Sequence, residues 1–210
     1  MTATEIVKAK RPDLAKGALL VLSIIGFAIV CYADKRFLVD SSDREWVHIA
    51  PFKWILLVHG IFAASALLTG ATQFWDALRT RRPQVHRMLG RVYIASALIG
   101  GLASLAIQLN FEPWPGRLAG ISHSMVFLTS TGFALAAIRQ RNIPLHRAWM
   151  MKSYAMCLIF IVNRLPDAVP NLEISPQLST AMLFLEVMIM FIACDVILTV
   201  RELNRKRRRG

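Results

Sequence analysis

The sequence predicts an all-α membrane protein in which a central bundle of four helices is flanked by a first and a sixth transmembrane helix. Of its 210 residues, 55% are hydrophobic and only 18% are charged, which is not the composition of a soluble domain. The apolar residues fall into six blocks of about 17–22 residues, the length that a helix needs to cross a hydrocarbon core of about 30 Å. The blocks do not alternate with a period of two residues, so they predict helices rather than barrel strands.

The six blocks give the expected spans. In chain order they cover residues 17–33, 54–75, 88–109, 118–138, 148–165 and 180–200. No linker or change of composition divides them, so residues 1–210 are predicted to form a single integral membrane domain that ends in a basic cytoplasmic tail at 201–210. The stretch "CYAD" after the first block is a poor cleavage site, and we therefore expect an uncleaved first helix.

The distribution of basic residues predicts the orientation. Nineteen of the 25 Lys and Arg residues lie in the N-terminal segment, in the connections before the third and fifth blocks together with the first five residues of those blocks, and in the tail. These segments share one side of a six-span topology, so the positive-inside rule places both termini in the cytoplasm. The net charge of +12 is accordingly interpreted as a signal for orientation and for lipid headgroups, with no role for nucleic acid.

An internal duplication joins the second and third spans to the fourth and fifth. The stretches "RRPQVHRMLGRVY" and "RNIPLHRAWMMKSY" each carry basic residues, a proline and a His-Arg pair, which is His86-Arg87 in the first and His146-Arg147 in the second. A proline just before each pair suits the first turn of a helix. The two stretches are therefore predicted to be the entrances of the third and fifth helices.

The preceding helix of each unit carries a second histidine. Lys53 comes six residues before His59, and Arg117 comes six residues before His123. Because the second and fourth spans both run from the outside inwards, these two histidines are expected at one depth near the outer face. By the same reasoning, the His-Arg pairs share a depth near the inner face, and about 27 Å separates the two levels. His48 is expected in an outer loop, apart from both levels.

Two imidazoles at one level favour haem over other metal centres. Zinc needs three or four protein ligands, and the chain has neither a third ligand at either level nor a CxxC or CxxCH motif. Haem needs only one or two axial ligands from the protein, because the porphyrin supplies four nitrogens. Neighbouring basic side chains suit the haem propionates. The expected partners are Arg87, Arg91, Arg147 and Lys152 at the inner level, and Lys53 and Arg117 at the outer level.

Six helices with one histidine on each of helices two to five resemble the di-haem transmembrane cytochrome b family of ascorbate-dependent ferrireductases. This resemblance covers about residues 53–164, and it implies axial ligation by His59 with His123 and by His86 with His146. The chain departs from that family in lacking evident ascorbate-binding motifs and in placing its inner histidines at the mouths of their helices. The stretches "HRMLGRVY" and "HRAWMMKSY" also resemble a bacterial family of predicted membrane proteins of unknown function, which implies an inner-membrane location.

These observations predict transmembrane electron transfer through one or two haem b groups, and leave open whether the chain is a membrane oxidoreductase. Quinol or a small reductant, a redox partner protein and a homodimeric partner are the candidate partners besides membrane lipids. The alternative is a haem-free polytopic protein, either a small-solute transporter or an assembly or scaffold subunit, because internal repeats also occur in transporters.

Two acidic residues of the last block are expected to have partners inside the membrane. Asp195 lies at a depth where Lys152 or Arg91 could pair with it, and Glu186 could accept a hydrogen bond from a ligand imidazole or a proton from quinol. Three glycines are expected to permit close packing of helices. They are Gly70, Gly100 and Gly101.

Overall fold

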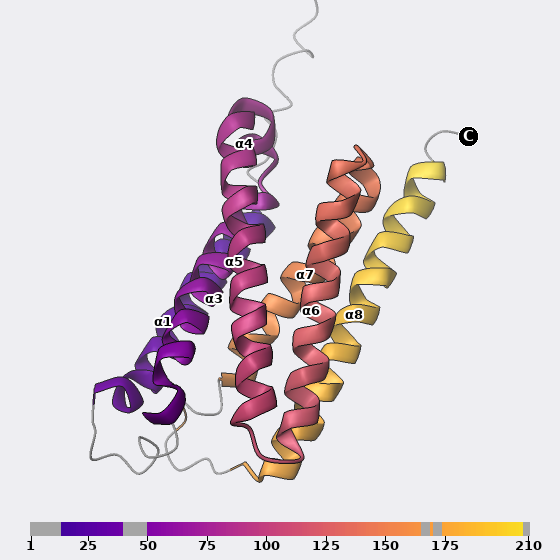
Figure 1. The fold of residues 1–210 in the computed structure, drawn as a ribbon. Coiled ribbons are helices and arrows are strands. Elements are labelled where there is room, and N and C mark those ends of the chain that lie inside the picture. The colour runs from indigo at the N-terminus through magenta and orange to yellow at the C-terminus, as the bar shows by residue number, and fades with distance from the viewer. Residues whose placement is uncertain (1–13, 40–49, 165–168, 170–173, 208–210) are drawn as a thin grey trace, which may run out of the picture.

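The computed structural model describes residues 14–39, 50–164, 169 and 174–207, and these residues confirm the predicted all-α class (Figure 1). The described residues form seven α-helices and one 3-10 turn. They are α1 (Leu14–Val39), η2 (Ala50–Phe52), α3 (Lys53–Gln73), α4 (Asp76–Arg81), α5 (Pro83–Asn110), α6 (Gly116–Arg139), α7 (Ile143–Arg164) and α8 (Pro176–Arg207). The predicted outer-loop residue His48 lies outside the described residues, as do the first 13 residues and the last three of the basic tail.

Four stretches are long and apolar enough to cross a membrane, which confirms the prediction of a membrane protein with several transmembrane helices. They are Ala50–Gln73, Pro83–Asn110, Gly116–Arg139 and Pro176–Asn204. In α1 the apolar stretch Gly17–Ile29 is shorter, and α7 is not among the four. Helix α7 carries three basic residues along its length, Arg147, Lys152 and Arg164.

The helix entrances follow the predicted pattern. Pro83 is in the first turn of α5, where a missing N–H costs nothing, and Pro144 is the second residue of α7. At both entrances the histidine amide closes the first turn: His86 donates to the carbonyl of Arg82 at 3.1 Å, and His146 donates to that of Asn142 at 2.9 Å. Helices α5 and α8 extend beyond their apolar blocks, and the short helix α4 was not predicted.

The helices pack in the order in which the chain connects them. Helix α5 lies along α3, and α7 lies along α6, so each predicted repeat is a pair of packed helices. Helix α5 also packs against α6, and α3 has a smaller contact with α7, which leaves α3 opposite α6 and α5 opposite α7. Helix α1 covers α3 and α7 on one side, and α8 covers α6 and α7 on the other (Figure 1).

Glycines permit the close approach of these helices, as predicted. A Cβ atom on Gly70 would lie 2.5 Å from the ring of Tyr154 and 2.7 Å from that of Tyr93. A Cβ atom on Gly101 would lie 2.7 Å from a methyl carbon of Leu128. Such distances are shorter than a side-chain atom tolerates, so a larger residue at either position would force its neighbour to shift.

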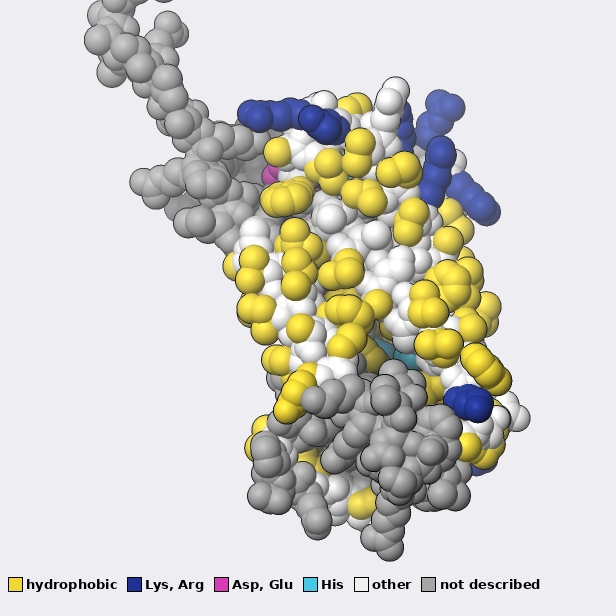
Figure 2. All heavy atoms as spheres, turned by 90° about the vertical axis from the view of Figure 1, so that its left-hand side faces the viewer, with side chains coloured by type: hydrophobic (Ala, Val, Ile, Leu, Met, Phe, Trp, Pro, Cys, Tyr) yellow, Lys and Arg dark blue, Asp and Glu magenta, His cyan; other side chains and the backbone are white. Residues whose placement is uncertain are grey.

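The surface of the described helices is divided as a membrane protein requires. Figure 2 shows hydrophobic side chains over most of the visible face, and most of the Lys and Arg side chains at the end where α4 lies. Large apolar side chains are exposed along this surface, for example Leu102 and Ile189. Lipid is the solvent in which such a surface is stable.

Candidate functional site

The outer pair of predicted histidines is anchored on backbone carbonyl groups. His59, on α3, donates its Nδ1–H to the carbonyl oxygen of Gly100 on α5 at 2.9 Å. His123, on α6, donates its Nε2–H to the carbonyl oxygen of Met156 on α7 at 3.0 Å. Each imidazole is therefore fixed to the second helix of its own repeat, and each keeps one ring nitrogen that makes no hydrogen bond to that helix.

The two outer imidazoles belong to one level. His59 and His123 interact electrostatically with each other, although α3 and α6 lie on opposite sides of the bundle. Aromatic rings surround them: Phe160 meets His59 edge-on with ring centroids 5.8 Å apart, and Phe127 stacks on His123 at 6.5 Å. The two imidazoles thus lie within electrostatic range of each other.

The inner pair lies at the entrances of α5 and α7, which are also opposite one another. His146 donates its Nδ1–H to the carbonyl oxygen of Ala134 on α6 at 2.9 Å. His86 interacts electrostatically with His146, and its buried Nδ1 has no hydrogen-bond partner within the described part of the chain. A buried polar atom without a partner is costly, so this nitrogen is a candidate for a ligand.

Cations converge on the inner pair. The guanidinium groups of Arg79, Arg87 and Arg147, from three different helices, all act electrostatically on His86. Arg91 is one turn further along α5 and is exposed. The inner level is therefore strongly positive, and only Arg79 has a carboxylate partner there among the contacts described, which is Asp76.

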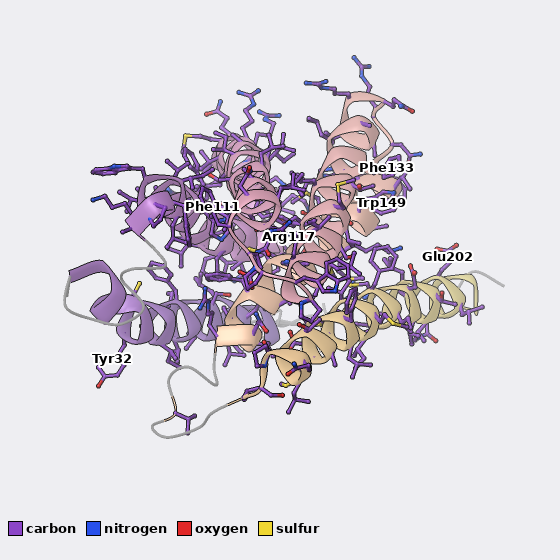
Figure 3. All side chains as sticks on the ribbon, turned by 60° about the horizontal axis from the view of Figure 1, so that its bottom comes forward. Tyr32, Phe111, Arg117, Phe133, Trp149 and Glu202 are labelled. Atoms are coloured by element: carbon purple, nitrogen blue, oxygen red, sulfur yellow. The ribbon has the colours of Figure 1, made fainter. Side chains whose placement is uncertain are left out.

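The cations predicted for the outer level lie at helix ends. Lys53 is the first residue of α3, with its ammonium nitrogen 5.4 Å from the centroid of the Trp54 ring. Arg117 donates its Nε–H to the carbonyl oxygen of Glu112 at 2.8 Å, and Figure 3 labels it at the end of α6. Lys53 and Arg117 thus both have local contacts at these helix ends.

The predicted partner of Asp195 is confirmed. The ammonium nitrogen of Lys152 lies 2.7 Å from its Oδ1. Lys152 is therefore engaged by α8 rather than by the inner histidine pair. Glu186, which lies on the same helix, has a buried Oε2 with no hydrogen-bond partner in the described chain, and no described contact joins it to His59.

A group of buried hydroxyls that the sequence analysis missed lies between the two histidine levels. The Tyr93 hydroxyl is 2.6 Å from Ser153 Oγ, which is in turn 2.7 Å from Thr131 Oγ1. The Tyr154 hydroxyl is 2.7 Å from Ser23 Oγ. We call these five residues the hydroxyl layer, and all of them are almost completely buried.

One signal in the sequence could have indicated this layer. Tyr93 and Tyr154 are the tyrosines that end the two repeated stretches, at similar distances from His86 and His146. A phenol inside an apolar helix needs a hydrogen-bond partner, so the recurring tyrosine predicts buried polar residues at its depth.

No three His, Cys, Asp or Glu residues come together in the described ranges, so side chains alone form no metal site there.

The comparison with protein families matches residues 56–199 to the family described as "Predicted membrane protein (DUF2306)". That range contains all four histidines of the two levels. No curated protein and no solved structure matches the chain.

Proposed function

The chain belongs to the DUF2306 family of predicted membrane proteins, and we propose that it is a transmembrane electron carrier with two haem b sites. The observation that carries the proposal is the placement of the four histidines. Each level has two imidazoles on opposite helices of one bundle, His59 with His123 and His86 with His146. Two imidazoles on opposite helices could serve as the two protein ligands that a haem group would need at each level.

The hydrogen bonds of the rings favour a role as metal ligands. A metal-bound imidazole usually donates its other ring N–H to a carbonyl or carboxylate oxygen, which fixes the ring. His59 and His146 do this through Nδ1 and leave Nε2 for iron. His123 donates through Nε2, so its ring must turn about the Cβ–Cγ bond to offer that nitrogen. The buried Nδ1 of His86 has no hydrogen-bond partner among the described residues, so this ring would be available to the iron.

The basic residues near the histidines and the hydroxyl layer would then have separate roles. Haem, when bound, supplies the reversible one-electron chemistry of its iron, and two histidines leave no coordination position for oxygen. At the inner level Arg87, Arg91 and Arg147 would pair with propionates, and at the outer level Lys53 and Arg117 would do so by extending along apolar surface. The hydroxyl layer lies between the two levels. Along α6, for example, Thr131 lies about 12 Å beyond His123 in the direction of the inner level.

The proposal includes six spans in a bacterial inner membrane. Helices α1 and α7 would cross with the four longer apolar helices, α7 being sheltered by α6 and α8. The basic end that carries α4 would face the cytoplasm, together with both termini. Electrons would pass between partners at the two faces, for which a membrane quinol, a small reductant or a redox protein are the candidates, and the chain could form a homodimer.

A haem-free transporter or scaffold is the second candidate, and the hydroxyl layer is the observation in its favour. Polar side chains inside a membrane bundle often mark a path for a polar solute. Here, however, the hydroxyls of Tyr93, Ser153 and Thr131 satisfy one another, which fits a structural core better than an open path.

The test is the absorption spectrum of the protein purified from haem-replete cells. Two bis-histidine sites predict a reduced-minus-oxidised spectrum with the sharp α and β bands of a low-spin b-type haem. A colourless protein would reject electron transfer through haem and favour the second candidate.

A further inference from the structure

A groove runs along the outer side of α6, α7 and α8. Its main part is an open hollow of about 470 Å³ that is almost entirely apolar. Residues from all three helices line it, among them Met125, Thr129, Trp149, Val187 and Phe191. A second hollow of about 290 Å³ begins at Ile192, which the two share, and continues along α8 past Asp195.

One end of this groove is polar. Lys152 lies between α7 and α8 with its ammonium nitrogen 4.8 Å from the ring centroid of Trp149 and 4.1 Å from that of Phe191, two residues that line the main hollow. The Lys152 side chain is only 12% exposed, whereas that of its partner Asp195 is 55% exposed. A carboxylate that faces hydrocarbon is costly, so a ligand that hydrogen-bonds to it would be stabilised there.

We propose that the groove binds a membrane quinone, a neutral flat ring with oxygen atoms at its edge and an isoprenoid tail. Lys152 and Asp195 neutralise each other and still offer one donor and one acceptor, which suits the oxygens of a quinone or the hydroxyls of a quinol. A phospholipid headgroup fits less well, because its phosphate would meet the exposed carboxylate of Asp195 while the ammonium group of Lys152 is buried. The aromatic walls suit a flat ring, and the volume lies in the range of small-molecule sites.

The groove also lies close to the inner histidine level. Trp149 follows His146 by one helical turn of α7, and its ring contacts that of Phe133 on α6 at a centroid distance of 4.8 Å (Figure 3). A ring bound against Trp149 would therefore be a neighbour of the inner pair. Quinone binding needs only the groove, whereas a quinone acting as the redox partner of the inner level rests on the proposed function.

The experiment is a titration of the full-length protein in nanodiscs of quinone-free phosphatidylcholine with decylubiquinone, followed by quenching of tryptophan fluorescence. We expect saturable quenching that is weakened by about tenfold in Val187→Phe, which fills the groove, and in the charge-neutral double variant Lys152→Met/Asp195→Leu. Ile189→Phe, a matched change on the exposed lipid face of α8, should leave the affinity within about twofold of wild type.

Quenching that rises linearly with quinone and is equal in all variants would overturn the inference. So would native mass spectrometry that finds a phospholipid retained by the wild type and lost from Val187→Phe, with no displacement by decylubiquinone. The readout does not depend on haem: a colourless protein with saturable binding rejects only the proposed function, and a haem protein with linear quenching rejects only the quinone site.

Discussion

His59 donates its ring Nδ1–H to the backbone carbonyl oxygen of Gly100 across the contact between α3 and α5, at 2.9 Å. The two helices are close at this point: a Cβ atom on Gly100 would lie 3.3 Å from the backbone nitrogen of Ala63, one turn after His59. The position of the imidazole is therefore set by helix packing. In the second repeat, His123 likewise donates a ring N–H to the backbone carbonyl oxygen of Met156 on the next helix.

Gly70→Ala tests whether close packing holds the centre of the bundle. The new methyl group would meet the ring of Tyr154 at 2.5 Å, and that ring is held by its hydroxyl contact with Ser23, so we expect a loss of about 1–3 kcal/mol of stability. Gly60→Ala is the matched control, because nothing lies within 4 Å of its Cβ position. Reversible unfolding in mixed micelles measures both. Equal stability of the two variants would contradict the packing at Gly70.

The hydroxyl layer predicts a specific coupling between two mutations. In a double-mutant cycle, Tyr93→Phe and Ser153→Ala remove the same 2.6 Å hydrogen bond, and a bond of this kind inside a membrane protein contributes about 0.6 kcal/mol. Tyr93→Phe with Ser23→Ala should be additive, because Ser23 is hydrogen-bonded to Tyr154 instead. Unfolding free energies of the single and double variants give both coupling values. Coupling between Tyr93 and Ser23 without coupling between Tyr93 and Ser153 would show that the hydrogen bonds of the hydroxyl layer are assigned wrongly.

Removing one partner of the ion pair between Lys152 and Asp195 should lower the melting temperature more than removing both. Lys152→Met alone leaves Asp195 as an unpaired charge in a membrane-spanning helix, so the melting temperature of the detergent-solubilised protein should fall. Adding Asp195→Leu removes that charge, and the double variant should recover most of the loss. A double variant less stable than Lys152→Met would mean that Asp195 has a further stabilising role.

The distribution of basic residues predicts the topology of three described connections. Reporter fusions after Arg82 and after Gln140 should report the cytoplasm, whereas a fusion after Glu112 should report the opposite side. Alkaline phosphatase and green fluorescent protein fusions give complementary signals. An external signal after Arg82 would reverse the assignment of the inner and outer histidine levels.

Some features could be predicted because sequence alone contains the physical constraint. A helix that crosses lipid must be long and apolar, and this located the apolar parts of α3, α5, α6 and α8. An ionisable group inside such a helix needs a partner at its own depth, and the helical rise indicated Lys152 or Arg91 for Asp195, of which the structure shows Lys152. Pro83 and Pro144 marked helix entrances because proline lacks the amide that the first turn does not use.

Other features depend on packing that the sequence does not specify. The hydroxyl of Thr131 also donates to the carbonyl of Phe127 in its own helix, and that of Ser23 donates to Leu19, so hydroxyl residues have a local partner wherever they lie. Their presence therefore does not reveal a layer. Similarly, the ring nitrogen that His123 uses depends on which carbonyl lies nearby, and only the placement of Met156 decides it.

The number of haem groups per chain, measured by the pyridine haemochrome assay, is the most direct test of the account. We expect about two in the wild type and about one in His59→Ala, in His123→Ala and in their double variant, because both residues would bind the same iron. His59→Ala combined with His86→Ala should remove both, since these residues belong to different levels. Wild-type protein without haem, or single histidine variants with unchanged haem content, would contradict the assignment of the two pairs.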